Sequence, residues 1–200
     1  MADFQQWIRS VVAGDLLVVR RMLKSDPSLA TQVCKQGATR QKSREYFFES
    51  IGHYMYAGDT ALHMAAAAHN AAMIELLLKA GSDIEATNRR GATALHYAAD
   101  GDPGGKGRGA KAQADAISVL CQSGANVEAR TKDGVCALHR AVRTRCSLAV
   151  AALLAAGADR NARNKNGSTP LDLAKRTTGR GGSGTPEAKL EQTAILKLLA

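Results

Sequence analysis

Apolar residues occur along the chain in short blocks with helical spacing, separated by polar turns that contain glycine. Two blocks follow the i, i+3, i+4 spacing that places side chains on one face of a helix: Ile74, Leu77 and Leu78, and then Ile117, Leu120 and Cys121. The apolar residues are mainly Ala, Leu and Val, and only 4% of all residues are aromatic. This pattern predicts an all-α protein and argues against an all-β sandwich.

The blocks recur at a fixed distance, which is typical of a repeat architecture. The segments GDTALH, GATALH, GVCALH and GSTPLD begin 33, 43 and 33 residues apart, at Gly58, Gly91, Gly134 and Gly167. Removing ten residues from the middle interval brings Leu120 back into phase with Leu77. The sequence therefore predicts 33-residue repeats, one of which carries an insertion.

Each repeat carries the signals of a helix start and, further on, of a helix end. Three starts have a threonine that can accept hydrogen bonds from the first free amides of a helix: Thr60, Thr93 and Thr169. Pro170 follows at the first helical position, where its missing N–H is not needed. Cys136 replaces the threonine in one repeat, which should weaken that cap by about 1 kcal/mol. Glycines that favour a left-handed helix end follow the second helices, at Gly81, Gly124 and Gly157.

The pattern G-x-T-x-L-H-x-A-A, a leucine-rich second helix and G-A-D-x-N resembles the ankyrin repeat over residues 58–200, and GDLLVVRRMLKSDPSLA resembles part of a weaker first unit. The resemblance implies an all-α ankyrin-repeat solenoid of about five helix-turn-helix repeats with extended turn tips. We expect a single domain over residues 1–200. Its parts are a degenerate N-terminal repeat (1–34), an aromatic and basic insertion (35–57), three repeats (58–90, 91–133 and 134–166) and a C-terminal capping repeat (167–200).

Three insertions interrupt the repeat frame, at residues 35–57, 101–110 and 178–190. The first holds five of the eight aromatic residues: Tyr46, Phe47, Phe48, Tyr54 and Tyr56. These rings either form a contact arm for a partner or pack down over the first two repeats. The second is glycine-rich and contains Lys106, but it lacks the G-x-x-x-x-G-K-[ST] pattern of a phosphate loop. We expect a flexible basic loop there, without a bound nucleotide.

Three histidines recur at the repeat period: His63, His96 and His139. The resemblance implies that each holds adjacent repeats together through backbone hydrogen bonds. Stacked repeats lie on the order of 10 Å apart, which is too far for one metal ion whose nitrogen ligands lie about 2 Å away. The sequence also lacks G-x-S-x-G, H-E-x-x-H and a recognisable Cys–His pairing. We therefore expect no enzyme activity, no cofactor, no metal site and no small-molecule substrate.

The formal net charge of +9 would attract acidic proteins, nucleic acid or anionic membrane surfaces. The four cysteines have no disulfide-framework spacing, and the first residues lack the apolar core of a signal peptide. No apolar run approaches the roughly 18 to 20 residues needed to span a bilayer. We expect a soluble, cytoplasmic protein with reduced thiols and no membrane partner.

The resemblance implies that a partner binds along a concave surface made of the turn tips and the exposed edge of each first helix. The tip positions carry Arg89, Arg90, Arg130, Lys132, Arg163 and Lys165, and the helix edge carries Arg143 and Arg176. Asp100 and Asp133 are acidic exceptions. The hypothesis is a protein partner with an acidic surface. Nucleic acid is the alternative partner for the same cations, and simple solvation of exposed turns would also explain them.

Overall fold

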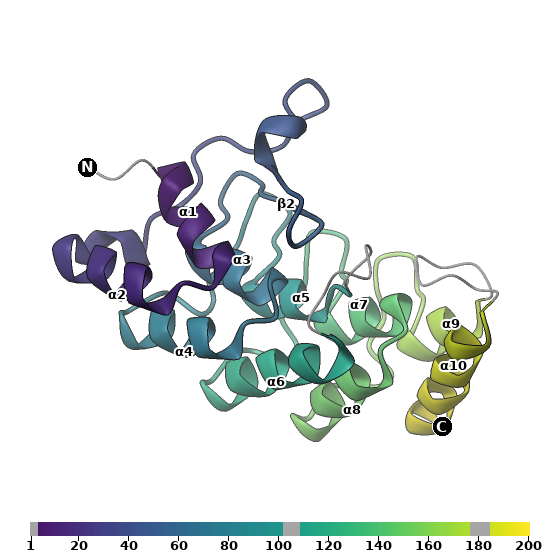
Figure 1. Cartoon of the computed structure of the whole chain (residues 1–200). Helices are drawn as coiled ribbons and strands as arrows, with labels where there is room; N and C mark the ends of the chain where they lie inside the picture. Colours follow the sequence, from purple (N-terminus) through teal and green to yellow (C-terminus); the bar gives the residue numbers. More distant parts are fainter. Residues whose placement is uncertain (1–3, 102–108, 177–184) are drawn as a thin grey trace.

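The computed structural model describes residues 4–101, 109–176 and 185–200. Within these ranges the helices are α1 (Phe4–Ala13), α2 (Leu16–Ser25), α3 (Ala61–Ala67), α4 (Ala71–Lys79), α5 (Ala94–Ala99), α6 (Gly109–Gln122), α7 (Ala137–Thr144), α8 (Ser147–Ala155), α9 (Pro170–Lys175) and α10 (Pro186–Leu199). They form two rows, odd-numbered helices in one and even-numbered helices in the other, with the termini at opposite ends (Figure 1). The predicted all-α repeat solenoid is confirmed.

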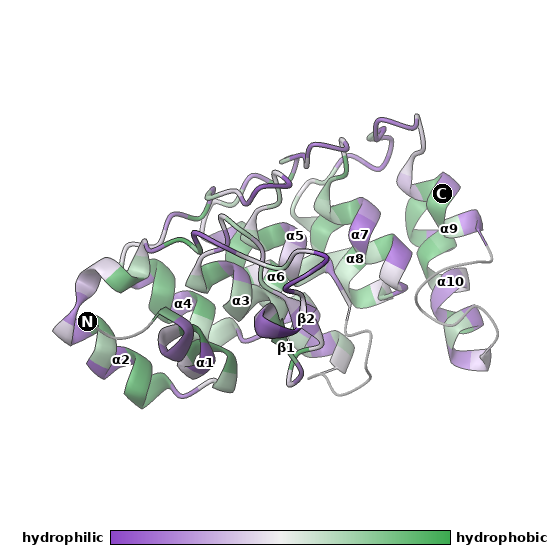
Figure 2. Ribbon diagram, turned by 90° about the horizontal axis from the view of Figure 1, so that it is seen from above, coloured by the Kyte–Doolittle hydropathy of each residue, from purple (hydrophilic) through white to green (hydrophobic). Residues whose placement is uncertain are grey.

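The core runs between the two rows and along the whole stack. α3 packs against α5, α5 against α7 and α7 against α9, while α4, α6, α8 and α10 form the corresponding outer series. Ile74, Leu77, Ile117 and Leu120, the centres of the apolar blocks, are fully buried. The helices are largely hydrophobic, whereas the segments that join successive pairs run along one edge and are mainly hydrophilic (Figure 2). Each helix pair therefore buries its apolar face against its neighbours.

The inner helices begin where the sequence predicts. α3, α5, α7 and α9 start directly after Thr60, Thr93, Cys136 and Thr169. Thr60 Oγ1 lies 2.9 Å from His63 Nδ1, and Cys136 Sγ lies 2.9 Å from His139 Nδ1. The thiol therefore occupies the place of the threonine hydroxyl. A sulfur is a weaker hydrogen-bond donor and acceptor than a hydroxyl oxygen, so this repeat has the weaker cap.

We expect Cys136→Thr to raise the free energy of unfolding by about 0.5 to 1 kcal/mol, because it restores a hydroxyl cap at the start of α7. The site accepts this shape, since Thr60 and Thr93 are buried at the equivalent position of two other repeats. Urea unfolding of both proteins checks the prediction. Cys136→Val is the matched control, because valine has the shape of threonine but lacks the hydroxyl that would cap α7. A Cys136→Thr protein that is no more stable than wild type would contradict the weak-cap interpretation.

The two glycine-rich insertions end within helices. α6 begins at Gly109 and α10 begins at Pro186, so the last residues of both insertions are helical. The Thr185 hydroxyl accepts from Ala188 N at 3.2 Å, and Pro186 takes the first helical position, which explains the early start of α10. The rejected phosphate loop around Lys106 lies outside the described residues.

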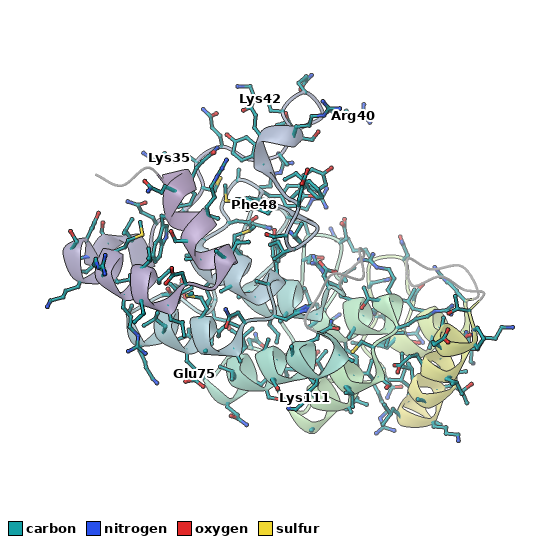
Figure 3. All side chains as sticks on the ribbon, in the orientation of Figure 1. Lys35, Arg40, Lys42, Phe48, Glu75 and Lys111 are labelled. Carbon is teal, nitrogen blue, oxygen red and sulfur yellow. The ribbon has the colours of Figure 1, made fainter. Side chains whose placement is uncertain are left out.

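The hairpin insertion, residues 35–57, projects from the stack above α3 and α5 (Figure 1). It contains a short antiparallel pair, β1 (Phe47–Phe48) and β2 (His53–Tyr54), with Phe47 opposite Tyr54. Tyr46 and Met55 are buried in the main core, whereas Phe47 and Tyr54 are exposed. Arg40 and Lys42 lie at its outer end, away from the helices (Figure 3). Of the two alternatives for these rings, both therefore hold in part: Tyr46 packs into the core of the repeats, and Phe47 and Tyr54 form an exposed aromatic surface.

All four cysteines are free thiols, and Cys34, Cys136 and Cys146 are buried. Burial, together with the negative charge of Asp59, raises the pKa of the Cys34 thiol to about 11. None of the helices in the described ranges has the length and apolar character that crossing a membrane would require. Among the same residues, no three His, Cys, Asp or Glu side chains are grouped so that they could hold a metal ion.

Candidate protein-interaction surface

Successive turn tips are joined to one another by backbone hydrogen bonds. Arg89 N donates to Ala57 O at 2.8 Å, Lys132 N to Arg90 O at 2.9 Å and Lys165 N to Asp133 O at 3.0 Å. We call this row the tip ladder, defined by residues 89–90, 130–133 and 163–165. Because the bonds fix each tip against the next, the cations that the sequence places in three separate repeats lie along one line.

Glycine permits this close approach of the tips. Gly134 has a φ of +70°, and a Cβ atom added to it would lie 2.9 Å from Lys165 N in the next tip. A side chain there would be strained by the backbone conformation and would also press on the amide that bonds to Asp133. The repeat glycine therefore has a packing reason as well as a conformational one.

The first tip contacts the hairpin insertion. Arg89 Nη2 donates to Ala38 O at 2.7 Å. The Arg89 and Arg90 guanidinium carbons lie 5.3 and 4.6 Å from the centroid of the Tyr56 ring, within the range of cation–π attraction. Both guanidinium groups therefore help to hold the hairpin insertion as well as providing positive charge.

The cations of the later tips differ in their contacts. Arg130 Nη1 donates to Arg163 O in the next tip at 2.9 Å, and Arg163 Nη1 donates to Gly167 O at 2.8 Å. Lys132 and Lys165 are exposed, and their ammonium groups make no hydrogen bond or ion pair with the described part of the chain. These two lysines are therefore the tip cations whose charge is least committed to the fold.

The two predicted helix-edge cations do not belong to the tip ladder. Arg143 lies in the last turn of α7, where its Nη2 is 3.8 Å from Asp100 Oδ1. Arg176 follows α9, and its Nη2 donates to Ser168 Oγ at 3.0 Å. The positive charge of Arg143 is thus partly balanced, so the inner-helix edge is less one-sided in charge than the sequence suggests.

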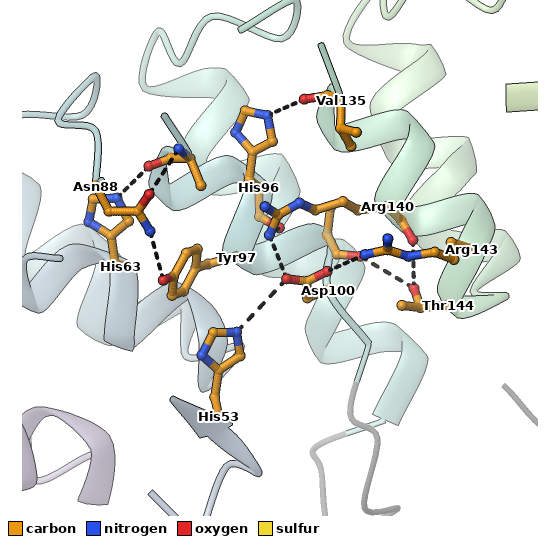
Figure 4. A network of polar contacts seen from close by, with 12 residues as sticks. His53, His63, Asn88, His96, Tyr97, Asp100, Val135, Arg140, Arg143 and Thr144 are labelled. Atoms are coloured by element: carbon orange, nitrogen blue, oxygen red, sulfur yellow. Dashed lines mark hydrogen bonds and ion pairs between the residues drawn. The ribbon is translucent and has the colours of Figure 1, made fainter. Parts of the chain in front are cut away.

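Asp100 is the centre of a polar network beside the hairpin insertion (Figure 4). Its carboxylate accepts from Arg140 Nη1 at 2.5 Å and lies 3.8 Å from His53 Nε2 on β2. The His53 ring lies 4.5 Å from the Tyr97 ring. Burial alone would raise the pKa of Asp100, but the charge of Arg140 above all, together with the neighbouring His53 and Arg143, holds it at about 2. The ionised carboxylate therefore joins α5, α7 and the hairpin insertion.

A second polar network, which is buried, surrounds Asp59. Asp59 is fully buried and accepts from the Tyr97 hydroxyl at 2.8 Å, from Asn88 Nδ2 at 2.9 Å and from Tyr56 N at 2.5 Å. Burial and the neighbouring Asp59 charge raise the pKa of Tyr97 well above its usual value. The tyrosine thus stays protonated and ties the start of α3 to the first tip and to α5.

The periodic histidines make the contacts that the resemblance implies. Their Nε2 atoms donate to backbone oxygens of the following repeat: His63 to Ala92 O at 3.0 Å, His96 to Val135 O at 2.9 Å and His139 to Ser168 O at 3.0 Å. Each Nδ1 accepts from the backbone N–H of the capping residue. Both ring nitrogens of the neutral imidazole therefore make a hydrogen bond. In the last repeat, the Asp172 carboxylate accepts from Thr169 N in the same way.

The sequence analysis did not single out Arg140, Tyr97 or His53. The available signal was the repeat frame, since Arg140 and Tyr97 occupy the position after the motif histidine, where the buried Met64 stands in another repeat. A charged or hydroxylated side chain at a buried repeat position requires a partner. His53 carried no such signal, because the hairpin insertion lies outside the repeat frame.

The fold and the contacts between repeats define a solenoid of stacked helix pairs, and the sequence matches known families accordingly. The family described as ankyrin repeats in many copies matches residues 50–98 and 120–174, and the single ankyrin repeat matches residues 90–132. The chain belongs to the ankyrin-repeat family, whose repeats are in general protein–protein interaction modules.

A curated protein shares part of this sequence. The chain is similar to Notch-regulated ankyrin repeat-containing protein A of Danio rerio, with 48% identity over 44 residues. The aligned segment covers 22% of this chain and 39% of that relative. The chain therefore spans less than half the length of the curated relative that it matches.

Proposed function

We propose that this protein is a non-enzymatic, cytoplasmic interaction module that binds an acidic segment of a partner protein on its concave, basic face. The observation that carries the proposal is the tip ladder, whose backbone bonds align cations from three repeats. Arg89, Arg90, Arg130, Lys132, Arg163 and Lys165 provide this row of cations. The proposed partner-binding residues also include Arg143, in the last turn of α7, and Arg176, directly after α9. A row of like charges raises the local potential and favours encounter with an acidic surface.

Membership of the ankyrin-repeat family supports the protein-binding role, and the free thiols agree with a reducing compartment. A standard interface needs roughly 800 Å² per partner, which a row of tips can supply without a deep pocket. No cofactor or small-molecule substrate is part of this proposal. The same cations could neutralise phosphates, so nucleic acid is the competing partner that the experiment must separate.

The test uses the two ladder lysines, Lys132 and Lys165, whose ammonium groups make no hydrogen bond or ion pair with the described residues. We expect Lys132→Glu/Lys165→Glu to weaken binding to the partner at least about tenfold at physiological salt, because it reverses two charges of the ladder. The matched control is Lys24→Glu/Lys197→Glu, which changes the net charge equally but alters exposed residues of the outer helices α2 and α10.

The measurement is a pull-down from the native cell lysate, with and without nuclease treatment, followed by titration of the captured protein against all three forms of the chain. Capture that is lost with the ladder variant and kept with the control supports the proposal. Equal affinity of all three forms would rule out the ladder as the site. Capture that disappears on nuclease treatment would assign the surface to nucleic acid.

A further inference from the structure

The hairpin insertion exposes two aromatic rings side by side. Phe47 and Tyr54 are opposite each other in the β1–β2 register, their ring centroids are 4.7 Å apart, and 36% and 38% of their surfaces are exposed. Large exposed rings in contact are good anchors for a partner, because Tyr and Phe bury much apolar surface and lose little conformational freedom on binding.

These rings adjoin the tip ladder. Tyr54 lies 6.5 Å from Tyr56, and the guanidinium groups of Arg89 and Arg90 lie over Tyr56. We call Phe47, Tyr54 and Tyr56 the aromatic row. An apolar surface thus passes directly into a cationic one, at the end of the ladder that is nearer the N-terminus.

The aromatic row is held in place by hydrogen bonds within the hairpin insertion and by contacts with the repeats. Met55 is buried in the core and its N–H donates to Tyr46 O at 2.9 Å, while Ala38 N donates to Met55 O at 2.9 Å. His53 lies against Tyr97 on α5 and beside Asp100. Because the hairpin insertion is anchored on both sides of Tyr54, its exposed rings are ordered before a partner arrives, which lowers the entropic cost of binding.

Resting on the proposed function, we infer that the aromatic row is the second half of the partner site and takes an apolar side chain at one end of an acidic, extended segment. The cations of the tip ladder favour the acidic part of the partner segment, and the rings of the aromatic row favour its apolar side chain. With neighbouring repeats packed about 10 Å apart, three tips span about 20 Å. At about 3.3 Å per extended residue, the acidic part is six or seven residues long.

The test uses three labelled synthetic peptides and fluorescence anisotropy at physiological salt. One peptide alternates glutamate and serine over seven residues, and the other two add a tryptophan at the amino or the carboxyl end. We expect one tryptophan peptide to bind wild type at least about fivefold more tightly than the plain peptide, which is the gain of a well-packed aromatic contact.

The matched variants separate the two halves of the site. Phe47→Ser/Tyr54→Ser should abolish the tryptophan gain and leave the plain peptide unchanged. Leu148→Ser/Leu190→Ser, which also replaces two exposed apolar residues but on α8 and α10, should keep the gain. Circular dichroism confirms that each variant remains folded.

The outcomes distinguish this inference from the proposed function. A plain peptide that binds wild type, with no gain from either tryptophan or with a gain that survives Phe47→Ser/Tyr54→Ser, overturns the inference and leaves the basic ladder standing. Failure of all three peptides to bind overturns the proposed function and this inference together.

Discussion

Lowering the pH from 7 to 4 is expected to reduce the free energy of unfolding by about 3 kcal/mol through His96 alone. Burial, followed by the charge of Arg140, lowers the pKa of His96 from 6.5 to about 4. As the pH falls through 6.5, His96 therefore takes up a proton in the unfolded chain but stays neutral in the folded chain. Stability is complete above pH 6.5 and is lost progressively down to pH 4.

The contacts of His96 explain why it stays neutral in the folded chain. His96 Nδ1 accepts from Thr93 N at 3.2 Å, so a proton on Nδ1 would break this hydrogen bond and place a charge in a buried site. His63 and His139 have the same arrangement, and burial lowers their pKa values as well. Their contributions have the same sign as that of His96 and also begin to be lost as the pH falls below 6.5. Asp100, with a pKa of about 2, loses its ionised form only at lower pH.

Urea unfolding at intervals between pH 7.5 and pH 4 measures this effect. His96→Gln is the matched variant: it loses stability at neutral pH, because a glutamine cannot reproduce both ring contacts, but its stability should depend less steeply on pH than that of wild type. The prediction concerns the slope of the free energy of unfolding against pH, and it does not depend on the absolute stability of the variant. Equal slopes for the two proteins would mean that His96 is not a buried neutral group.

Leu77→Ala is expected to cost about 2 to 5 kcal/mol of unfolding free energy, because it leaves a cavity at a site that is fully buried. Leu77 lies on α4, which packs against α2, α3 and α6. The substitution therefore weakens the contacts of one repeat with both of its neighbours. In a solenoid such interface contacts supply much of the stability, since no repeat buries its apolar face alone.

The control for this prediction is Leu17→Ala, the same chemical change at a leucine that is 77% exposed. We expect it to change the free energy of unfolding by less than about 0.5 kcal/mol. Urea unfolding of both variants and wild type at pH 7.5 makes the comparison. A cost below about 1 kcal/mol for Leu77→Ala would be incompatible with its place in the core between repeats.

The sequence by itself determined the features that depend on short-range signals repeated in phase. Thr60 or its equivalent, the following alanine and the motif histidine mark α3, α5 and α7, while Thr169 and Pro170 mark α9. The structure has these helices at the expected residues. The glycine ends of the second helices were predicted in the same way. Periodicity also placed the cations of the tip ladder in equivalent positions, because one 33-residue frame governs all the tips. Whether a partner binds there stays a prediction.

Only the tertiary structure decided how the hairpin insertion lies on the repeats and which charges are balanced. His53, Asp100 and Arg140 come from segments about 40 residues apart or more, and their meeting depends on how the hairpin insertion packs. Likewise, Arg89 is bonded to Ala38 O, whereas Lys132 has no side-chain bond within the described ranges. In a repeat protein, local helix signals that recur every 33 residues determine where the backbone of each helix and turn lies. Side-chain pairing across an insertion has no period, and it is set by long-range packing and the need to satisfy buried charges.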